Sequence, residues 1–584
     1  MLRLLRFLIP HRKFVASLIF LNILLSAVLT VAPLVIKTIV DEVIGRQQQQ
    51  LLVPYLGLLL MVTTVRTITV YFYSLRQNML GQFVMTDVRT ALYKKLLALP
   101  YSFYDREQTG RLMSRISSDV ESTRIFLSQI LTESLSHTLT ISFASIALSS
   151  QDQLLFTIAV FPILASGFAM YLLHRKLTRP WLLQHEQSAA MSSVLQDSLS
   201  GIKVVKAFAH ESQTQEKFET AHMTLRKGNL LIQDTWNLRW SVIGSVPRFM
   251  QLALFLVGGN RVMAGDISLG TLVAVVSLSL LLLGAMNSLG SQLNGFSQTA
   301  TAATRIFELL DEPVVLNPRS SISDTFNSNS TKSRSPHWNC TGDIEYQQIN
   351  FSYPSSKHNA LTGINLKIPA GSSLAVVGAT GSGKTTLLQL LGRFYDPTGG
   401  QVLVDGHDVS TLDPTQLRQQ IGIVSQDTLL FSATVADNIA FGQPDASQQD
   451  IEHAAKIAQA HEFIVQMAAG YQTRIGERGV GLSGGQRQRI AIARAILLNP
   501  KILLLDDSMS AVDSETEVML QTAIKQAMIG RTTLLVAHRL STSQTANKII
   551  VLREGRIVEE GTHATLAASG GYYQHVLSMQ QMGT

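Results

Sequence analysis

The stretch that decides the fold of the second half of this chain is GATGSGKTT, residues 378–386. It matches the pattern G-x-x-x-x-G-K-[ST], follows the apolar run SSLAVVG and precedes the helix-like run TLLQLLGRF. A glycine-rich turn between a strand and a helix lets backbone N–H groups converge on phosphate oxygens, and the start of the helix adds partial positive charge. We therefore predict a nucleotide-binding loop in an α/β domain.

The side chains of this loop have separate expected roles. Lys384 is expected to reach the β- and γ-phosphates, and the Thr385 hydroxyl is expected to bind Mg²⁺. The other residues expected to contact ATP here are Gly378, Thr380, Gly381, Ser382, Gly383 and Thr386. The alternative, a glycine turn that binds nothing, is disfavoured because the loop has both the strand before it and the helix after it.

A pair of acidic residues follows an aliphatic run further along the same half, in KILLLDDSMSAVD. The run Ile502–Leu505 ends in Asp506, which is typical of a buried strand that presents an acid at its C-terminal end. We expect Asp506 to hold Mg²⁺ through water and Asp507 to polarise the attacking water. Two adjacent aspartates are weak evidence alone, but in one domain with a phosphate-binding loop they are strong.

The segment LSGGQRQR, residues 482–489, predicts a second anion-binding helix N-terminus. Ser483, Gly484, Gly485 and Gln486 precede or open a helix-like run, IAIARAILL. One domain with two phosphate-receiving helix ends suggests that each nucleotide is held between two copies of the domain.

The composition of the whole chain points to a membrane. Only 15% of its 584 residues are charged and 46% are hydrophobic, whereas soluble domains carry roughly 25% charged residues. This excludes a disordered chain and argues against a wholly soluble one. The single cysteine, Cys340, excludes an internal disulfide framework. The net charge is only +7, whereas a nucleic-acid binder of this size would show a concentrated basic patch, so the position of the charges matters more than their sum.

Stretches long enough to cross a bilayer, about 20 apolar residues each, occur only before residue 300. We predict six spans, near 14–40, 52–74, 129–149, 154–173, 242–263 and 269–292. The third is the least certain because Glu133 and His137 interrupt it. Lys and Arg gather before the first span and in the connections 75–128 and 174–241. Both termini and these connections are therefore expected to be cytoplasmic, in a multi-pass protein of the inner or plasma membrane.

The two connections have helical periodicity, so we expect them to extend the spans into the cytosol as antiparallel rods. The rods would turn near 103–112 and near 206–216. On their own, these turns are equally well interpreted as polar turns or as contacts that receive force from a soluble domain. Inside the spans, Arg66, Glu133 and His137 favour snorkelling or pairing between helices over substrate contact.

The predicted domains are a helical transmembrane domain, 1–317, a linker rich in Ser, Thr and Asn, 318–340, and an α/β nucleotide-binding domain, 341–584. The combination of GATGSGKTT, LSGGQ and LLLDD behind six spans resembles an ABC exporter half-transporter over essentially the whole chain.

The resemblance implies further roles. Tyr353 would stack on adenine, Gln426 would contact Mg²⁺ and the attacking water, and His538 would contact the γ-phosphate. The loop Ser510–Asp513 would cross the dimer interface, so that Asp513 is expected near the nucleotide. Glu477 would lie in a segment that meets the cytoplasmic turns, which favours the interpretation of both turns as coupling elements.

One residue departs from the family pattern, because Asp507 stands where the family usually has Glu. Its carboxylate is drawn back by about 1.5 Å, and a misplacement of that order costs about 10²-fold in rate. The resemblance therefore implies a heterodimer. The Lys384–Asp506–Asp507 set of this chain would form a slow site, and its Ser483–Gly485 would complete a fast site on the partner. The alternative is a homodimer in which Asp507 serves as the base.

The expected function is ATP-driven export of hydrophobic or amphiphilic compounds, with drugs as the first expectation and lipids as the second. ATP and Mg²⁺ are the expected cofactors. The expected partners are a second half-transporter, membrane lipids and the substrate, with no nucleic acid. The alternatives are a homodimeric lipid flippase and an ATP-gated channel or sensor. No peptidase-like extension precedes residue 14, which disfavours peptide processing and export. Six spans exclude a soluble ABC ATPase.

Overall fold

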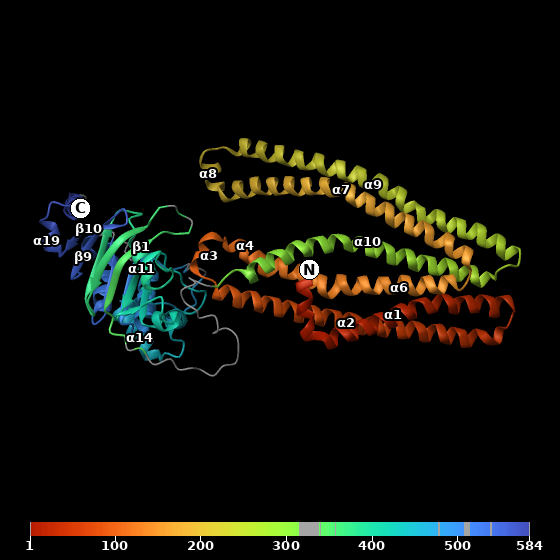
Figure 1. Cartoon of the computed structure of the whole chain (residues 1–584), viewed down its shortest axis with the longest axis horizontal. Helices are drawn as coiled ribbons and strands as arrows, with labels where there is room; N and C mark the ends of the chain where they lie inside the picture. Colours follow the sequence, from red (N-terminus) through yellow and green to blue (C-terminus); the bar gives the residue numbers. More distant parts are fainter. Residues whose placement is uncertain are drawn as a thin grey trace. The chain divides into compact units, whose positions relative to one another are not determined.

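The computed structural model describes residues 2–314, 338, 340–354, 356, 358–476, 479, 481–506, 514–537 and 540–582. The chain divides into two compact units. One is Met1–Leu97 with Thr109–Glu312, and the other is Ala98–Gln108 with Pro313–Thr584. Figure 1 shows long helices in the first unit and β-sheets with short helices in the second. The predicted linker, 318–340, lies almost entirely outside the described residues.

The first unit is built from long helices, as the apolar stretches predict. Its main helices are α1 (Arg12–Thr38), α2 (Leu52–Ala98), α6 (Leu131–Ser149), α7 (Gln153–Ser200), α9 (Glu211–Met263) and α10 (Leu269–Asp311). Its shorter segments are η1 (Leu2–His11), η2 (Ile39–Gly45), η3 (Gln49–Leu51), α4 (Thr109–Ser114), η4 (Arg115–Asp119), α5 (Val120–Ile125), η5 (Phe126–Ile130) and α8 (Ile202–Ala207). Every one of the six predicted spans lies in helix.

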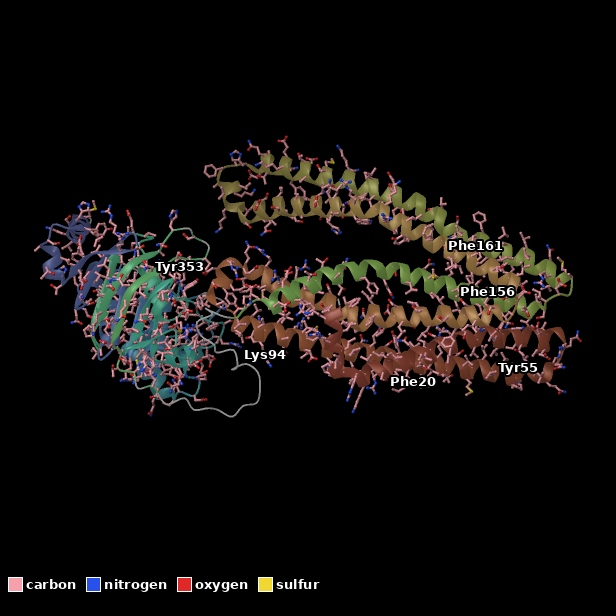
Figure 2. The ribbon with its side chains drawn as sticks, in the orientation of Figure 1. Phe20, Tyr55, Lys94, Phe156, Phe161 and Tyr353 are labelled. Atoms are coloured by element: carbon pink, nitrogen blue, oxygen red, sulfur yellow. The ribbon has the colours of Figure 1, made fainter. Side chains whose placement is uncertain are left out.

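Within the described residues, 4 helical stretches are long and apolar enough to cross a membrane by length and composition. They are Arg3–Gly45, Gln49–Ala98, Gln153–Leu177 and Leu269–Gln292. The predicted spans 129–149 and 242–263 are helical as well, in η5–α6 and in α9. Large apolar side chains such as Phe20 and Phe161 project from the surface of this unit (Figure 2). Such a surface suits a lipid environment better than water.

The predicted rods are present, and α7 runs side by side with α9 (Figure 1). The first rod breaks just before the predicted turn: α2 stops at Ala98, before Pro100, and α3 (Tyr101–Arg106) follows. The prediction of the second turn near 206–216 is wrong by several residues. The turn spans residues 201–210 and contains α8, because α9 already begins at Glu211. The polar stretch ESQTQE is an exposed first part of a helix, and Glu211 there favours the positive N-terminus.

The second unit contains two sheets. The antiparallel one has the order β2 (Leu361–Ile368), β1 (Ile344–Phe351), β4 (Gly399–Val404), β5 (His407–Asp408). The other has the order β10 (Arg556–Gly561), β9 (Lys548–Arg553), β3 (Ser373–Gly378), β8 (Thr532–Val536), β7 (Ile502–Asp506), β6 (Ile421–Val424). Only the β10–β9 pair of this sheet is antiparallel among the described strands.

Short helices surround these sheets in the second unit. They are α3 (Tyr101–Arg106), α11 (Lys384–Leu391), α12 (Pro414–Gln419), α13 (Val435–Ile439), η6 (Ala440–Gly442), α14 (Gln448–Ile457), α15 (His461–Val465), η7 (Gly470–Gln472), α16 (Gly484–Leu497), α17 (Ser514–Met528), α18 (Leu540–Ser543), α19 (His563–Ala567) and α20 (Tyr572–Met582).

The strand β7 shows why an unbroken aliphatic run forms a central strand. All of its residues are buried, and successive side chains point to opposite faces of the sheet. Leu503 and Leu505 join a core that contains Ile490 of α16, whereas Ile502 and Leu504 join a core that contains Leu387 of α11. Because both faces of the parallel sheet are covered, β7 is apolar throughout until Asp506 at its end. The predicted fold class, a helical membrane domain with an α/β domain, is confirmed.

Candidate nucleotide-binding site

The glycine-rich loop leaves β3 at Gly378 and enters α11 at Lys384. Gly381 and Gly383 have φ angles of +82° and +103°, in the left-handed region that side chains disfavour. A Cβ atom at Gly383 would also lie 2.6 Å from the carbonyl oxygen of Ala360. Both the backbone conformation and the close approach therefore require glycine at position 383.

The lysine and the threonine of the loop are held in defined positions. Lys384 is 6% exposed, and its Nζ donates to the carbonyl oxygens of Gly378 and Ala379, each at 2.9 Å. The Oγ1 of Thr385 donates to Oδ1 of Asp506 at 3.1 Å. The fold thus brings the loop and the acid at the end of β7 together, in the juxtaposition that the sequence predicts.

Tyr353, labelled in Figure 2, belongs to the second unit. It lines a cavity of about 370 Å³ next to the loop. Its hydroxyl lies 2.7 Å from Oε1 of Gln389, to which it donates, and 3.0 Å from Oγ1 of Thr386. Burial raises the pKa of Tyr353, so its phenol stays neutral. The other predicted residues in the lining are Thr380, Gly381, Gly383, Lys384, Thr385 and Thr386.

The lining also contains residues that the sequence gives no signal for. His358, Asn359 and Ala360 precede β2 and lie on the cavity wall, although no motif marks them. The buried Oγ of Ser382 has no hydrogen-bond partner within the described part of the chain. Ser382 lies within the loop but not in the cavity lining, whereas the lysine and the threonine hydroxyls of the lining suit a phosphate-bearing ligand.

The second predicted helix N-terminus is present at α16. Ser483 caps this helix: its Oγ accepts from the backbone N of Gln486 at 3.2 Å, and its own N donates to Oε1 of Gln486 at 2.9 Å. Ser483 and Gly484 are exposed, while Gly485 is buried. This capping box fixes the loop–helix junction in a defined conformation and leaves it at the surface.

Two predicted residues, Asp506 and Gln426, fall at or just after the carboxyl ends of neighbouring parallel strands, where ligands of such sheets bind. Asp506 is the last residue of β7, and Gln426 is exposed just after the end of β6. The two strands are neighbours, because Val424 of β6 pairs with Leu505 of β7. His538 follows β8 in the sequence but lies outside the described residues, together with Asp507, Asp513 and Glu477.

The helix α3 packs on residues that follow the loop helix, within the second unit. The rings of Tyr101 and Phe394 have centroids 4.5 Å apart, and the hydroxyl of Tyr395 donates to the carboxylate of Asp105. Burial, together with this hydrogen bond, raises the pKa of Tyr395. The first predicted cytoplasmic turn therefore contacts the nucleotide-binding unit.

These features define a P-loop ATPase domain joined to a membrane domain. A family model described as "ABC transporter transmembrane region" matches residues 15–286, and one described as "ABC transporter" matches residues 361–510. The chain belongs to the ABC transporter family and is an ATP-hydrolysing transporter.

Relatives match along the whole chain. The uncharacterised ABC transporter ATP-binding protein YknU of Bacillus subtilis is 36% identical over 578 residues, which cover 98% of this chain and 96% of the relative. YgaD of the same organism, provisionally named a multidrug export ATP-binding/permease protein, is 34% identical over 599 residues, which cover 100% of this chain and 99% of YgaD. An ATP-dependent lipid A-core flippase of Syntrophus aciditrophicus is 33% identical over 586 residues, which cover 99% of this chain and 94% of the flippase.

Proposed function

We propose that this chain is one half of a dimeric exporter that uses ATP to move hydrophobic or amphiphilic compounds out of the cell by alternating access. The observation that carries the proposal is the Thr385–Asp506 contact at the glycine-rich loop, in the same chain as several apolar helices. The names of YgaD and of the lipid A-core flippase support drugs and lipids as the substrate classes. Six spans with a cytoplasmic ATPase domain agree with the distribution of Lys and Arg.

The loop would bind the phosphates of ATP through Lys384 and backbone N–H groups, with Tyr353 against the adenine. Thr385, Asp506 and Gln426 would hold Mg²⁺, which would neutralise charge on the phosphate oxygens. Asp507 would polarise the attacking water, and His538 would contact the γ-phosphate. Hydrolysis at this site then rests on positioning and electrostatic stabilisation by these residues.

The exposed end of α16 suits a site that is completed between two chains. Ser483–Gln486 would contact the nucleotide held by the partner subunit, and Asp513 would lie at the same interface. Since a helix N-terminus attracts phosphate, ATP would draw two ATPase domains together. Their closure and reopening would drive the exchange between inward- and outward-facing states.

The shorter carboxylate of Asp507 supports a heterodimer with one slow site. The test is to purify this chain alone and with candidate partner half-transporters, and to measure ATP hydrolysis. We expect hydrolysis near background for the chain alone and brisk hydrolysis in the assembled pair. Brisk hydrolysis by the chain alone, abolished by Asp507→Asn, would show a homodimer instead.

A homodimeric lipid flippase is the second candidate, supported by the relative from Syntrophus aciditrophicus. Proteoliposomes that contain the assembled protein separate the candidates. Uptake of a fluorescent drug into inside-out vesicles supports drug export. Accumulation of a short-chain fluorescent lipid in the opposite leaflet, without drug uptake, supports lipid flipping. ATP-dependent movement of neither would leave the ATP-gated channel or sensor.

A further inference from the structure

Glu133 is the only Asp or Glu in the six predicted spans. It lies in the first turn of α6 and is half-buried. Its Oε2 accepts a hydrogen bond of 3.3 Å from Nε2 of Gln292 on α10. Ser134 donates to Oε1 of the same Gln292 side chain. The carboxylate therefore lies between two packed helices and does not face the lipid alone.

Polar side chains continue from Glu133 across α1 and α2. Nε2 of Gln77 donates to Oγ1 of Thr132 at 3.0 Å, and the hydroxyl of Tyr73 donates to the same oxygen at 3.3 Å. Nδ2 of Asn22, a residue that is 0% exposed, donates to the carbonyl oxygen of Thr132 at 3.3 Å. Four helices thus contribute to one polar cluster, which consists of Asn22, Tyr73, Gln77, Thr132, Glu133, Ser134 and Gln292.

The polar cluster has a defined depth in the proposed topology. Tyr73 is near the cytoplasmic end of the second predicted span, and Gln292 is at the cytoplasmic end of the sixth. Glu133 is near the cytoplasmic end of the third. On the cytoplasmic side of the cluster, η5 and α10 pack closely, since a Cβ at Gly295 would lie 2.4 Å from Cδ1 of Ile130. The cluster therefore lies at the level where the head of an amphiphile in the inner leaflet would be.

Among the described residues, the hydrogen-bond donor to the Glu133 carboxylate is neutral. No Lys or Arg forms an ion pair with it among the residues whose side chains the structure describes. Gln292 is a neutral donor, and His137 lies one turn away from Glu133 on the same helix face. An anionic group at membrane depth is costly unless it is partnered or serves a ligand.

We propose that Glu133, positioned by Gln292, selects the charge of the exported compound by binding the cationic head of a lipophilic amphiphile. This inference rests on the proposed export function and names its substrate class. The apolar faces of the surrounding helices would hold the rest of the molecule, and the polar cluster would replace water around its head. The same chemistry would accept a cationic drug or a cationic lipid.

The test is binding to the full-length assembled transporter in lipid nanodiscs. The probes are tetraphenylphosphonium and tetraphenylborate, which share size and shape but carry opposite charge. We expect the wild type to bind the phosphonium more tightly, and Glu133→Gln to weaken phosphonium binding about ten-fold without weakening borate binding. Glu133→Asp should keep the preference. Glu308→Gln, at an exposed acid of α10 outside the spans, should leave both affinities unchanged.

Unchanged phosphonium binding by Glu133→Gln, or an equal loss for both ions in a variant that keeps the wild-type melting temperature, would overturn the proposal. If the melting temperature of Glu133→Gln is lower than that of the wild type, the ratio of phosphonium to borate affinity in Glu133→Asp decides. Loss of the preference for the phosphonium in Glu133→Asp overturns the proposal, and a preference that is kept supports it. A third probe, hexadecyltrimethylammonium, carries its cation on an alkyl chain and so distinguishes a lipid-like ligand from a compact one. Tight binding of either cation that depends on Glu133 supports the proposal.

Export is measured separately with an uncharged amphiphile. Absence of export by the wild type would count against the proposed function, whereas export with no Glu133-dependent charge preference would overturn only this inference.

Discussion

The rings of Tyr353 and Tyr395 meet edge to face, with centroids 5.3 Å apart and planes at 84°. Tyr353 is also hydrogen-bonded to Gln389 of the loop helix α11, and Tyr395 donates to Asp105 of α3. A short series of side chains therefore joins the wall of the nucleotide cavity to α3, in the first predicted turn. This is a physical route by which a change at the ATP site could move the end of α2.

Replacing Tyr395 by Phe removes the hydrogen bond to Asp105 and keeps the ring. We expect ATP binding to stay within about two-fold of wild type, because a phenol hydroxyl distant from the phosphates contributes little there. Stimulation of ATP hydrolysis by a transported compound should fall, since the link to α3 is weakened. The measurement is the ratio of stimulated to basal ATPase activity in proteoliposomes.

Tyr471→Phe is the matched control, because its hydroxyl lies 2.9 Å from Nδ1 of His461, in a hydrogen bond that involves no residue of α3. This variant should keep the wild-type ratio. Equal stimulation in Tyr395→Phe and wild type would contradict the proposed route.

Lys384→Ala should weaken ATP binding at this chain's own site by about 10²-fold, since the buried ammonium that is expected to reach the phosphates is lost. Thr385→Ala should lose the Mg²⁺ dependence of ATP binding, whereas Thr385→Ser keeps the hydroxyl and should keep this dependence. Binding of a fluorescent ATP analogue with and without Mg²⁺ measures both effects. Full affinity in Lys384→Ala would show that the phosphates bind elsewhere.

Arg305→Ala should destabilise the helical unit. Arg305 donates to both carboxylate oxygens of Asp119, at 2.5 and 2.8 Å, and Asp119 is 4% exposed. Removing the guanidinium leaves a buried carboxylate unpaired, which costs about 1–2 kcal/mol for a pair whose Arg is half exposed. The melting temperature of the purified protein in detergent should fall.

Arg3→Ala is the control for this variant. Arg3 pairs with Asp311 with the same two-bond geometry, but both side chains are about half exposed. The melting temperature of Arg3→Ala should therefore stay close to the wild-type value. A larger drop for Arg3→Ala than for Arg305→Ala would contradict this account.

The single cysteine should resist alkylation in the folded protein. Burial, helped by the nearby carboxylate of Asp405, raises the pKa of Cys340 to about 12. At pH 8 its thiolate population should be about 10³-fold below that of an ordinary thiol. Iodoacetamide labelling followed by mass spectrometry should be slow in the native state and fast in denaturant.

The same shift has a consequence for stability. Because the folded-state pKa is raised, the neutral thiol stabilises the fold below the unfolded pKa, and this contribution is lost as the pH rises from about 9 toward 12. The loss of stability over this window should be smaller in Cys340→Ala than in the wild type. Equal pH dependence in both proteins would contradict the shift.

The parts of the site that chemistry constrains were predictable from the sequence. A phosphate-binding loop needs glycines at fixed places, and Gly383 has the backbone angle and the close contact that exclude other residues. An acid that must reach Mg²⁺ at a sheet edge needs a buried strand before it, which is why the run ending in Asp506 was recognisable.

Other parts were not predictable because they depend on contacts distant in sequence or on ambiguous composition. Tyr395 and Asp105 are 290 residues apart in sequence, and nothing local marks either as a contact. His358 and Asn359 enter the cavity only because β2 returns beside the loop. A polar start of an exposed helix, as at Glu211, has the composition of a loop, so the second turn was misplaced.

The membership of Ala98–Gln108 in the second unit has a practical consequence for dissecting this protein. A fragment that begins at residue 341 would contain the whole nucleotide cavity but would uncover Phe394 and the hydroxyl of Tyr395, which α3 covers in the intact chain. Such a fragment should be less soluble than its charge suggests, and a peptide with the sequence of residues 98–108 should restore its solubility. The ATPase half is therefore interrupted in sequence and completed by a segment of the membrane half.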